Sequence, residues 1–192
     1  MSEWRPFYPS PGIRSREEFG DLLVSRGLTG TAVEVGTHEG KFAQTLLRSW
    51  PGRLFCVDPW VTLDDYKNDC INDRDREVDY RTAMDRLEPY RDRVTVVRKL
   101  SERAHHQFAN NSLDFVYLDG NHNREHFAED IYRWHGKVRQ GGVFAGHDWN
   151  GDWIDHVQPV LRAFCHEINR PAYIVLGDAA SWYMIKGESI IS

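Results

Sequence analysis

The sequence has few cysteines and no long apolar run. Its 192 residues include only Cys56, Cys70 and Cys165, and no two of them form a C-x-x-C pair. This odd, scattered set argues against a disulfide framework and against a cysteine-based zinc site. No apolar stretch approaches the roughly 20 residues that a membrane helix requires, and the first residues lack the apolar core of a signal peptide. We therefore expect a cytoplasmic protein without a membrane partner.

An excess of positive charge is also missing. The chain has 24 Lys and Arg against 29 Asp and Glu, so its net charge is 24 − 29 = −5. Because non-specific electrostatic binding to nucleic acid needs a basic surface, nucleic acid is not an expected partner. Hydrophobic residues make up 41% and charged residues 28% of the chain, which is ordinary globular usage. With no internal repeat, residues 1–192 are expected to form a single domain.

Predicted strands and helices alternate along the chain. Strands are expected at 31–36, 54–58, 94–97, 113–119 and 143–145, and helices at 15–26, 41–50, 64–69, 78–87, 125–139 and 154–168. Two last strands, 173–176 and 182–185, form a hairpin. This order predicts an α/β fold with a doubly wound, mostly parallel seven-stranded sheet and an antiparallel C-terminal hairpin. Residues 1–29 are expected to form an N-terminal arm and a helix, and residues 60–92 a lid.

Ligands of such sheets bind beyond the carboxyl ends of the strands. The first loop at that edge contains Gly36 and Gly40, which permit a sharp turn and close approach of a ligand to backbone amides. Its spacing differs from the dinucleotide fingerprint G-x-G-x-x-G, and its acids Glu34 and Glu39 suit a cationic ligand. Asp58 ends the next strand, where a carboxylate can accept the hydroxyls of a ribose. Because Pro59 follows directly, this interpretation is favoured over a helix N-cap.

A second set of polar residues follows the fourth and fifth predicted strands. Asp119 ends one strand, with His122 three residues beyond it, and the pair His147-Asp148 follows the other. Adjacent parallel strands bring these side chains to one edge. Two carboxylates and an imidazole can hold a divalent metal, and a histidine ligand favours Mn, Fe, Co or Zn over Mg²⁺. The alternative interpretation is that His122 and Asp148 only cap the helices that follow them.

These motifs together resemble a known family. Glu34-Val-Gly36-Thr-His-Glu-Gly40, Val57-Asp58-Pro-Trp60, Leu113-Asp-Phe-Val-Tyr-Leu-Asp119-Gly-Asn-His122, Asp130, Trp134 and Gly141-Gly142-Val-Phe-Ala-Gly-His147-Asp148 occur in that order. The pattern is similar to the class I S-adenosylmethionine-dependent methyltransferases, in particular the small-molecule group called family 24, relatives of the macrocin-type sugar O-methyltransferases. The resemblance covers about residues 30–150 and implies a Rossmann-like methyltransferase fold.

The resemblance also implies where the cofactor binds. It places the methionine moiety over residues 36–40, the ribose on Asp58, and the adenine near Trp60 and Ser101. Ser101 is alternatively a helix N-cap. The cofactor-binding residues expected in this way are Glu34, Gly36, Thr37, His38, Gly40, Asp58, Pro59, Trp60, Ser101 and Asp119. The expected metal ligands are Asp119, His147 and Asp148, for an ion such as Mg²⁺ or Mn²⁺; His147 stands where many relatives carry an acid.

The implied reaction is methyl transfer from S-adenosylmethionine to a hydroxyl of a sugar, phenol or other natural product. His122 stands near the position of the catalytic lysine in the catechol-type relatives, so His122 and Asp119 are the expected catalytic residues. Imidazole titrates close to neutral pH, which suits a base.

The acceptor side is less defined by the sequence. Trp60, Trp149, Trp153 and Tyr66 fall in loops beside this edge and are expected to form an aromatic acceptor pocket, unless they are core residues. Other interpretations are an amine or RNA acceptor, a metal-dependent hydroxylase or hydrolase, and a non-catalytic nucleoside-binding module. A homo-oligomer whose second subunit completes the site is also open.

Overall fold

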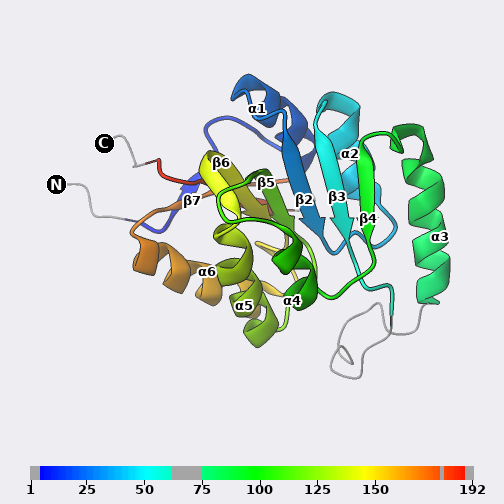
Figure 1. The fold of residues 1–192 in the computed structure, drawn as a ribbon. Helices are drawn as coiled ribbons and strands as arrows, with labels where there is room; N and C mark the ends of the chain where they lie inside the picture. Colours follow the sequence, from blue (N-terminus) through cyan, green and yellow to red (C-terminus); the bar gives the residue numbers. More distant parts are fainter. Residues whose placement is uncertain (1–4, 62–74, 178–179, 189–192) are drawn as a thin grey trace.

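The computed structural model describes residues 5–61, 75–177 and 180–188. It contains one sheet with helices on both faces (Figure 1). The strands are β1 (Phe7–Pro9), β2 (Thr31–Val35), β3 (Arg53–Val57), β4 (Val94–Val97), β5 (Leu113–Leu118), β6 (Val138–Gly146), β7 (Ala172–Val175) and β8 (Ser181–Ile185). The helices are η1 (Arg16–Glu18), α1 (Phe19–Ser25), α2 (Lys41–Ser49), α3 (Arg76–Leu87), η3 (Glu88–Tyr90), α4 (Ser101–Ala104), η4 (His105–Gln107), α5 (Arg124–His135) and α6 (Ile154–Ile168).

The sheet has the strand order β1-β7-β8-β6-β5-β2-β3-β4. All neighbours are parallel except β8, which runs antiparallel to both β6 and β7. The predicted fold class is therefore confirmed, including the antiparallel C-terminal hairpin. The order of connections reverses between β5 and β2, and such a switch point is where open α/β sheets bind ligands.

The described sheet has eight strands, not the predicted seven, because the N-terminal arm adds β1 to the edge. Phe7 pairs with Ala172 in β7, and Ser10 N donates to Ile174 O at 2.8 Å. Proline is tolerated on an edge strand, where one side of the backbone needs no partner. The prolines of this segment obscured the strand in the sequence.

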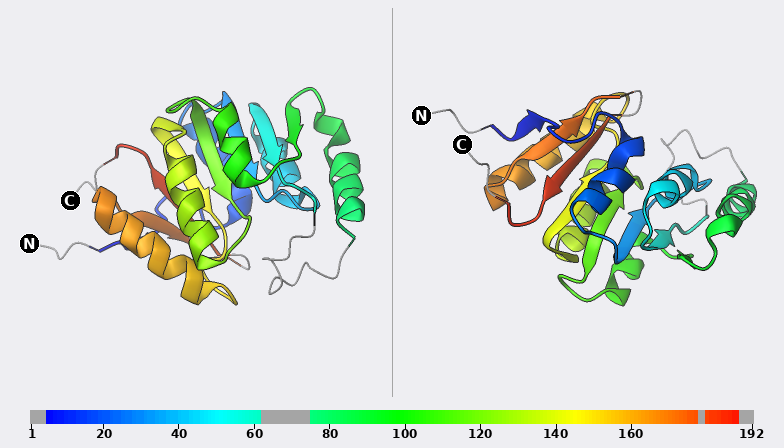
Figure 2. Two further views of the ribbon diagram at one scale, coloured as in Figure 1. Left: turned by 60° about the horizontal axis from the view of Figure 1, so that its bottom comes forward. Right: turned by 90° about the horizontal axis from the view of Figure 1, so that it is seen from above.

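The centre of the core is β5, whose six residues are all buried. Side chains on a strand alternate between faces. Val116 and Leu118 accordingly pack in one apolar cluster, with residues of α5 and α6, and Phe115 and Tyr117 pack in the other, with residues of α1 and α2. Figure 2 shows these two helical layers from other directions. Burial on both faces explains the nearly continuous apolar run that predicted this strand.

Two predicted helix boundaries differ from the structure. The helix expected at 125–139 ends at His135, because Val138 already pairs with Leu113 as the start of β6. The helix expected at 15–26 divides into η1 and α1. The helix expected at 64–69 lies outside the described residues. The lid expected over 60–92 stays a prediction, since 62–74 are not described and 76–87 form α3, beside α2 (Figure 1).

The register aligns the strand ends that carry the predicted site. Val35 of β2 pairs with Val57 of β3 and with Leu118 of β5, and Leu118 pairs with Gly146 of β6. The loops that follow these four strands therefore start side by side at one edge of the sheet. Within the described residues, no helix has the length and apolar character needed to cross a membrane.

Candidate active site

The loop after β2 turns sharply at Gly36, which has φ 91°. A Cβ at this position would lie 1.9 Å from the carbonyl oxygen of Asp119. Only glycine fits such a close approach and adopts this φ without strain. Gly36 thus brings the loop after β2 into direct contact with the loop after β5.

Asp58 joins the loop after β2 to the loop after β3. Its carboxylate accepts hydrogen bonds from the backbone amides of His38 at 2.9 Å and Trp60 at 2.8 Å. Burial raises the pKa of Asp58, although these two amides oppose the shift. No helix of the described chain begins at Asp58, so it is not an N-cap. Because each carboxylate oxygen has a second lone pair, Asp58 can still accept ligand hydroxyls.

A cavity of about 570 Å³, partly open to solvent, lies beside Asp58. It is lined by Val35, Gly36, Val57, Asp58, Pro59, Val61, Arg76, Lys99, Ser101, Gly120, Asn121 and Asp130. Trp60 does not line it in the structure. Its side chain is only 2% exposed and its Nε1 donates to His38 O at 2.9 Å, so a place beside an adenine stays a prediction for Trp60.

Ser101 lines this cavity but does not cap a helix with its side chain. Its hydroxyl donates to Asp130 Oδ1 at 2.5 Å and accepts from Trp134 Nε1 at 2.7 Å. Burial raises the pKa of Asp130 to about 6, although the hydrogen bond from Ser101 opposes the shift. No role is predicted from the sequence for Asp130 or for Asn121, and Asn121 Nδ2 is buried with no hydrogen-bond partner in the described part of the chain. Asp130 reaches the cavity through the packing of α5, which the sequence pattern does not show, whereas Asn121 lies in the loop after β5.

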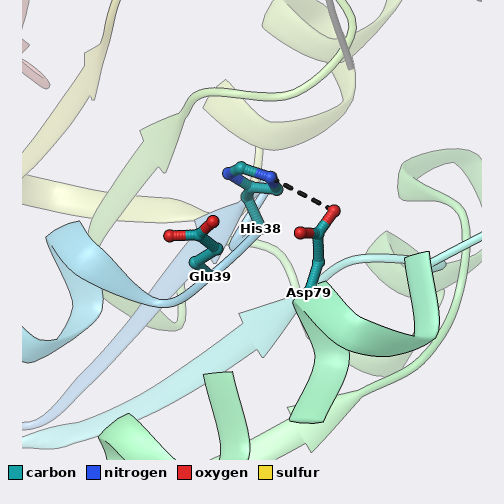
Figure 3. Close-up of side chains that lie close together, drawn as sticks. All are labelled: His38, Glu39 and Asp79. Carbon is teal, nitrogen blue, oxygen red and sulfur yellow. Dashed lines mark ion pairs between the residues drawn. The ribbon is translucent and has the colours of Figure 1, made fainter. Parts of the chain in front are cut away.

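The His38 side chain points toward Asp79 on α3, as Figure 3 shows. Its Nε2 lies 3.3 Å from Oδ2 of Asp79, a residue that is 3% exposed and also pairs with Arg76. Glu39 completes a group whose ligand atoms lie within 4.8 Å of one another, and Arg86 donates to its carbonyl oxygen. These contacts hold the glycine loop against α3.

The four polar residues predicted to meet after β5 and β6 do meet. His122 Nε2 lies 2.6 Å from Asp148 Oδ2 and 3.9 Å from Asp119 Oδ1. His147 Nδ1 lies 3.1 Å from Asp148 Oδ1 and 3.4 Å from Asp119 Oδ1. The backbone amide of His147 donates to Leu118 O at 2.9 Å, which continues the β5–β6 pairing into the site. Hereafter Asp119, His122, His147 and Asp148 are called the rim cluster.

The charges of the rim cluster stabilise each other. Burial raises the pKa of the Asp119 carboxyl, against the influence of the two imidazoles. Burial would also raise the pKa of Asp148, but hydrogen bonds from His122 and His147 hold it well below its usual range. Burial lowers the pKa of both imidazoles, yet the neighbouring carboxylates outweigh it and both pKa values are raised. The raised pKa values make both imidazoles stronger bases, beside an Asp148 that stays ionised.

With this geometry established, the comparison with known proteins is informative. A family model described as a methyltransferase domain matches residues 33–149, which include the glycine loop, Asp58 and the rim cluster. The chain belongs to this methyltransferase family. It is a class I S-adenosylmethionine-dependent methyltransferase, which decides against the hydrolase, hydroxylase and non-catalytic interpretations. No protein in the curated set matches the chain.

Solved structures show the same fold at low sequence identity. The O-methyltransferase from Bacillus cereus in complex with S-adenosylhomocysteine (SAH) has a TM-score of 0.62 and 18% identity, over 92% of this chain and 84% of that one. The O-methyltransferase NovP has a TM-score of 0.68 and 12% identity, over 90% and 78%. TomG from Streptomyces achromogenes, an O-methyltransferase, has a TM-score of 0.62 and 17% identity, over 90% and 79%.

The rim cluster of this methyltransferase has a donor set that fits a divalent metal. Asp119, His122 and Asp148 each place a ligand atom within 4.8 Å of the others. His147 Nε2 is buried and has no hydrogen-bond partner among the residues that the structure describes. Mixed carboxylate and imidazole donors suit Mn, Fe, Co or Zn more than Mg²⁺. The geometry groups His122 with the two carboxylates, whereas the sequence analysis expected His147 there, and the ligand set stays a prediction.

Of the residues predicted to form an aromatic acceptor pocket, Trp153 lies beside the rim cluster. Its ring centroid is 5.8 Å from that of His122 and 5.3 Å from that of His156. Trp149 instead packs against Phe7, with ring centroids 4.4 Å apart, and so anchors the N-terminal strand. Tyr66 lies outside the described residues. The aromatic acceptor pocket stays a prediction, with Trp153 beside the rim cluster.

Proposed function

We propose that this methyltransferase transfers the methyl group of S-adenosylmethionine to a hydroxyl group of a small molecule. The proposal rests mainly on the rim cluster, in which a histidine lies against two carboxylates directly beside the predicted cofactor loop. The three structural neighbours named above are O-methyltransferases, which supports the same class of acceptor here. The net charge of −5 supports a small molecule over RNA.

The two loops that meet at Gly36 support a position for the cofactor. The methionine moiety would lie over residues 36–40, with Glu34 near its ammonium group. The ribose hydroxyls would donate to Asp58, and the adenine would lie between Pro59 and Ser101. This placement uses the lining of the observed cavity and puts the reactive end of the cofactor toward Asp119.

Methyl transfer requires the acceptor oxygen to lose its proton as it attacks. The bound cofactor supplies a methyl group on a sulfonium; the O–C bond forms as the C–S bond breaks. His122 would take the hydroxyl proton, and Asp148 at 2.6 Å would stabilise the imidazolium that results. A divalent ion held by Asp119, Asp148 and a histidine would lower the pKa of the acceptor hydroxyl. Trp153 would cover the reacting group and exclude water.

Calorimetric titration with SAH tests the cofactor placement. Wild-type protein should bind SAH, and Asp58→Ala should weaken binding at least tenfold, because two hydroxyl hydrogen bonds to a carboxylate are lost. Asp85→Ala removes an exposed carboxylate and is the matched control, with wild-type affinity expected. Absence of SAH binding by the folded wild-type protein would refute the proposed function.

The same titration, repeated with chelator and with added Mn²⁺ or Mg²⁺, tests the metal. Heat from metal binding that is lost in Asp148→Ala would support metal assistance. Methyl transfer to hydroxyl acceptors that proceeds equally with chelator would leave His122 as the sole means of deprotonation and contradict the metal part of the proposal.

A further inference from the structure

A second cavity extends over the glycine loop and shares Gly36 with the first. Its charged and polar lining includes Arg16, Lys41, Glu34, Thr37 and Asp119. Cationic and anionic side chains thus line the same small space. A cavity with both signs of charge is complementary to a ligand group that itself carries both.

The anionic side of this cavity contains buried atoms that lack partners. Glu34 is 1% exposed and Thr37 is 3% exposed. Burial raises the pKa of Glu34 well above its usual range, although the nearby Thr37 hydroxyl opposes the shift. Neither Glu34 Oε2 nor Thr37 Oγ1 completes a hydrogen bond within the described chain. Buried polar atoms normally have partners. Because both residues line the cavity, a bound ligand with a hydrogen-bond donor would pair with these oxygen atoms.

On the cationic side, Arg16 is better placed than Lys41. The Lys41 side chain is 66% exposed and pairs with Glu39 at 3.0 Å. The Arg16 side chain is 24% exposed, and its nearest carboxylates, Glu17 and Asp119, lie at 3.8 and 3.9 Å, beyond hydrogen-bond distance. Its guanidinium hydrogen-bonds the Tyr117 hydroxyl, which leaves other N–H donors of the guanidinium for a ligand. A guanidinium presents a planar pair of donors that matches a carboxylate.

The fold holds Arg16 firmly in this position. Three residues later, Phe19 is completely buried and packs against Phe42 and Tyr117, with ring centroids 6.2 and 5.7 Å apart. The preceding turn is closed by Glu18 N donating to Ser15 O at 3.2 Å. The backbone of η1 is therefore fixed over the cavity, and less entropy is lost when Arg16 binds a ligand.

We propose that Arg16 binds the carboxylate of the cofactor's amino-acid tail while Glu34 faces its ammonium group. This inference rests on the proposed function and adds a residue outside the family-matched range 33–149. It makes the segment between β1 and β2 part of the cofactor site. The two ends of the tail are then distinguished by charge.

The test compares SAH with its decarboxylated analogue, which keeps the ammonium group, the sulfur and the adenosine. Titration of Arg16→Gln should show SAH affinity lowered between about tenfold and 100-fold, as expected for loss of a hydrogen bond between two charged groups. Affinity for the decarboxylated analogue should stay within about twofold of wild type. Arg14→Gln removes an exposed arginine from the same segment and should change neither affinity.

Two outcomes would overturn the inference while leaving the proposed function intact. One is equal loss of both ligands in Arg16→Gln, which would mean a structural role; the other is unchanged SAH affinity. The ratio of the two dissociation constants does not depend on the folded fraction, so partial unfolding does not obscure it. If Arg16→Gln does not fold, Arg16→Lys must prefer SAH over the decarboxylated analogue less strongly than wild type does. Failure of wild type to bind SAH would instead refute the proposed function itself.

Discussion

Replacing Gly36 by alanine tests whether the contact between the loops after β2 and β5 defines the site. Two costs combine at this position. A non-glycine residue at the observed φ of 91° costs about 1–2 kcal/mol. The new Cβ would also lie 1.9 Å from Asp119 O, and forcing atoms into such a packed contact costs about 1–3 kcal/mol more.

The chain contains a matched control for this prediction. Gly151 has the same φ of 91°, but a Cβ there would meet nothing within 4 Å. Gly151→Ala should therefore lower the free energy of unfolding by only about 1–2 kcal/mol, whereas Gly36→Ala should lower it by about 2–5 kcal/mol. Urea unfolding measures both values, with an unchanged m-value expected.

The clash should also have a functional consequence that backbone strain alone would not produce. Because the Asp119 backbone must move away from Gly36, the loops separate and SAH binding should weaken strongly in Gly36→Ala. Gly151→Ala should keep the wild-type affinity for SAH. Equal destabilisation of the two variants, with equal SAH affinity, would show that the close approach at Gly36 does not shape the site.

Two further predictions concern the pH dependence of stability. Burial raises the folded pKa of Asp130 from 3.8 to about 6. Its contribution to the free energy of unfolding is therefore fully present below pH 3.8 and is lost as pH rises through 6. Relative to Asp130→Asn, wild type should lose up to ~3 kcal/mol of unfolding free energy between pH 4 and pH 7. No such relative loss would show that Asp130 ionises freely. The folded pKa of His135 is lowered by burial from 6.5 to about 4, so stability is present above pH 6.5 and lost as pH falls toward 4. Relative to His135→Gln, wild type should lose up to ~3 kcal/mol over that range in denaturant titrations, and a constant difference would contradict a buried neutral His135.

The sequence predicted the parts of the fold that local patterns encode. The apolar run of β5 and the glycines after β2 are visible in consecutive residues because strand burial and sharp turns impose requirements on each position. The parallel alternation then placed Asp119 and Asp148 at one edge, where the structure shows them sharing two histidines. Their catalytic and metal-binding roles stay predictions.

Other features could not be derived from single positions. β1 depends on a free edge of β7 about 165 residues away in the chain, and its prolines argue against a strand. Asp130 reaches the cofactor cavity only because α5 packs beside α4, where Ser101 holds its carboxylate. The sequence places Trp60 in a loop beside the ligand, but in the structure its side chain is buried and its Nε1 donates to His38 O.

The sequence by itself determined the α/β class, the edge of the sheet that carries the site, and the residue types that follow each strand. These depend on local periodicity and on the shared direction of parallel strands. Only the tertiary structure decided which distant side chains meet, such as Arg16 with Asp119 and His38 with Asp79. Such contacts depend on how whole helices pack on the sheet. The residue spacing within one helix or strand does not encode which side chains of another element it will contact.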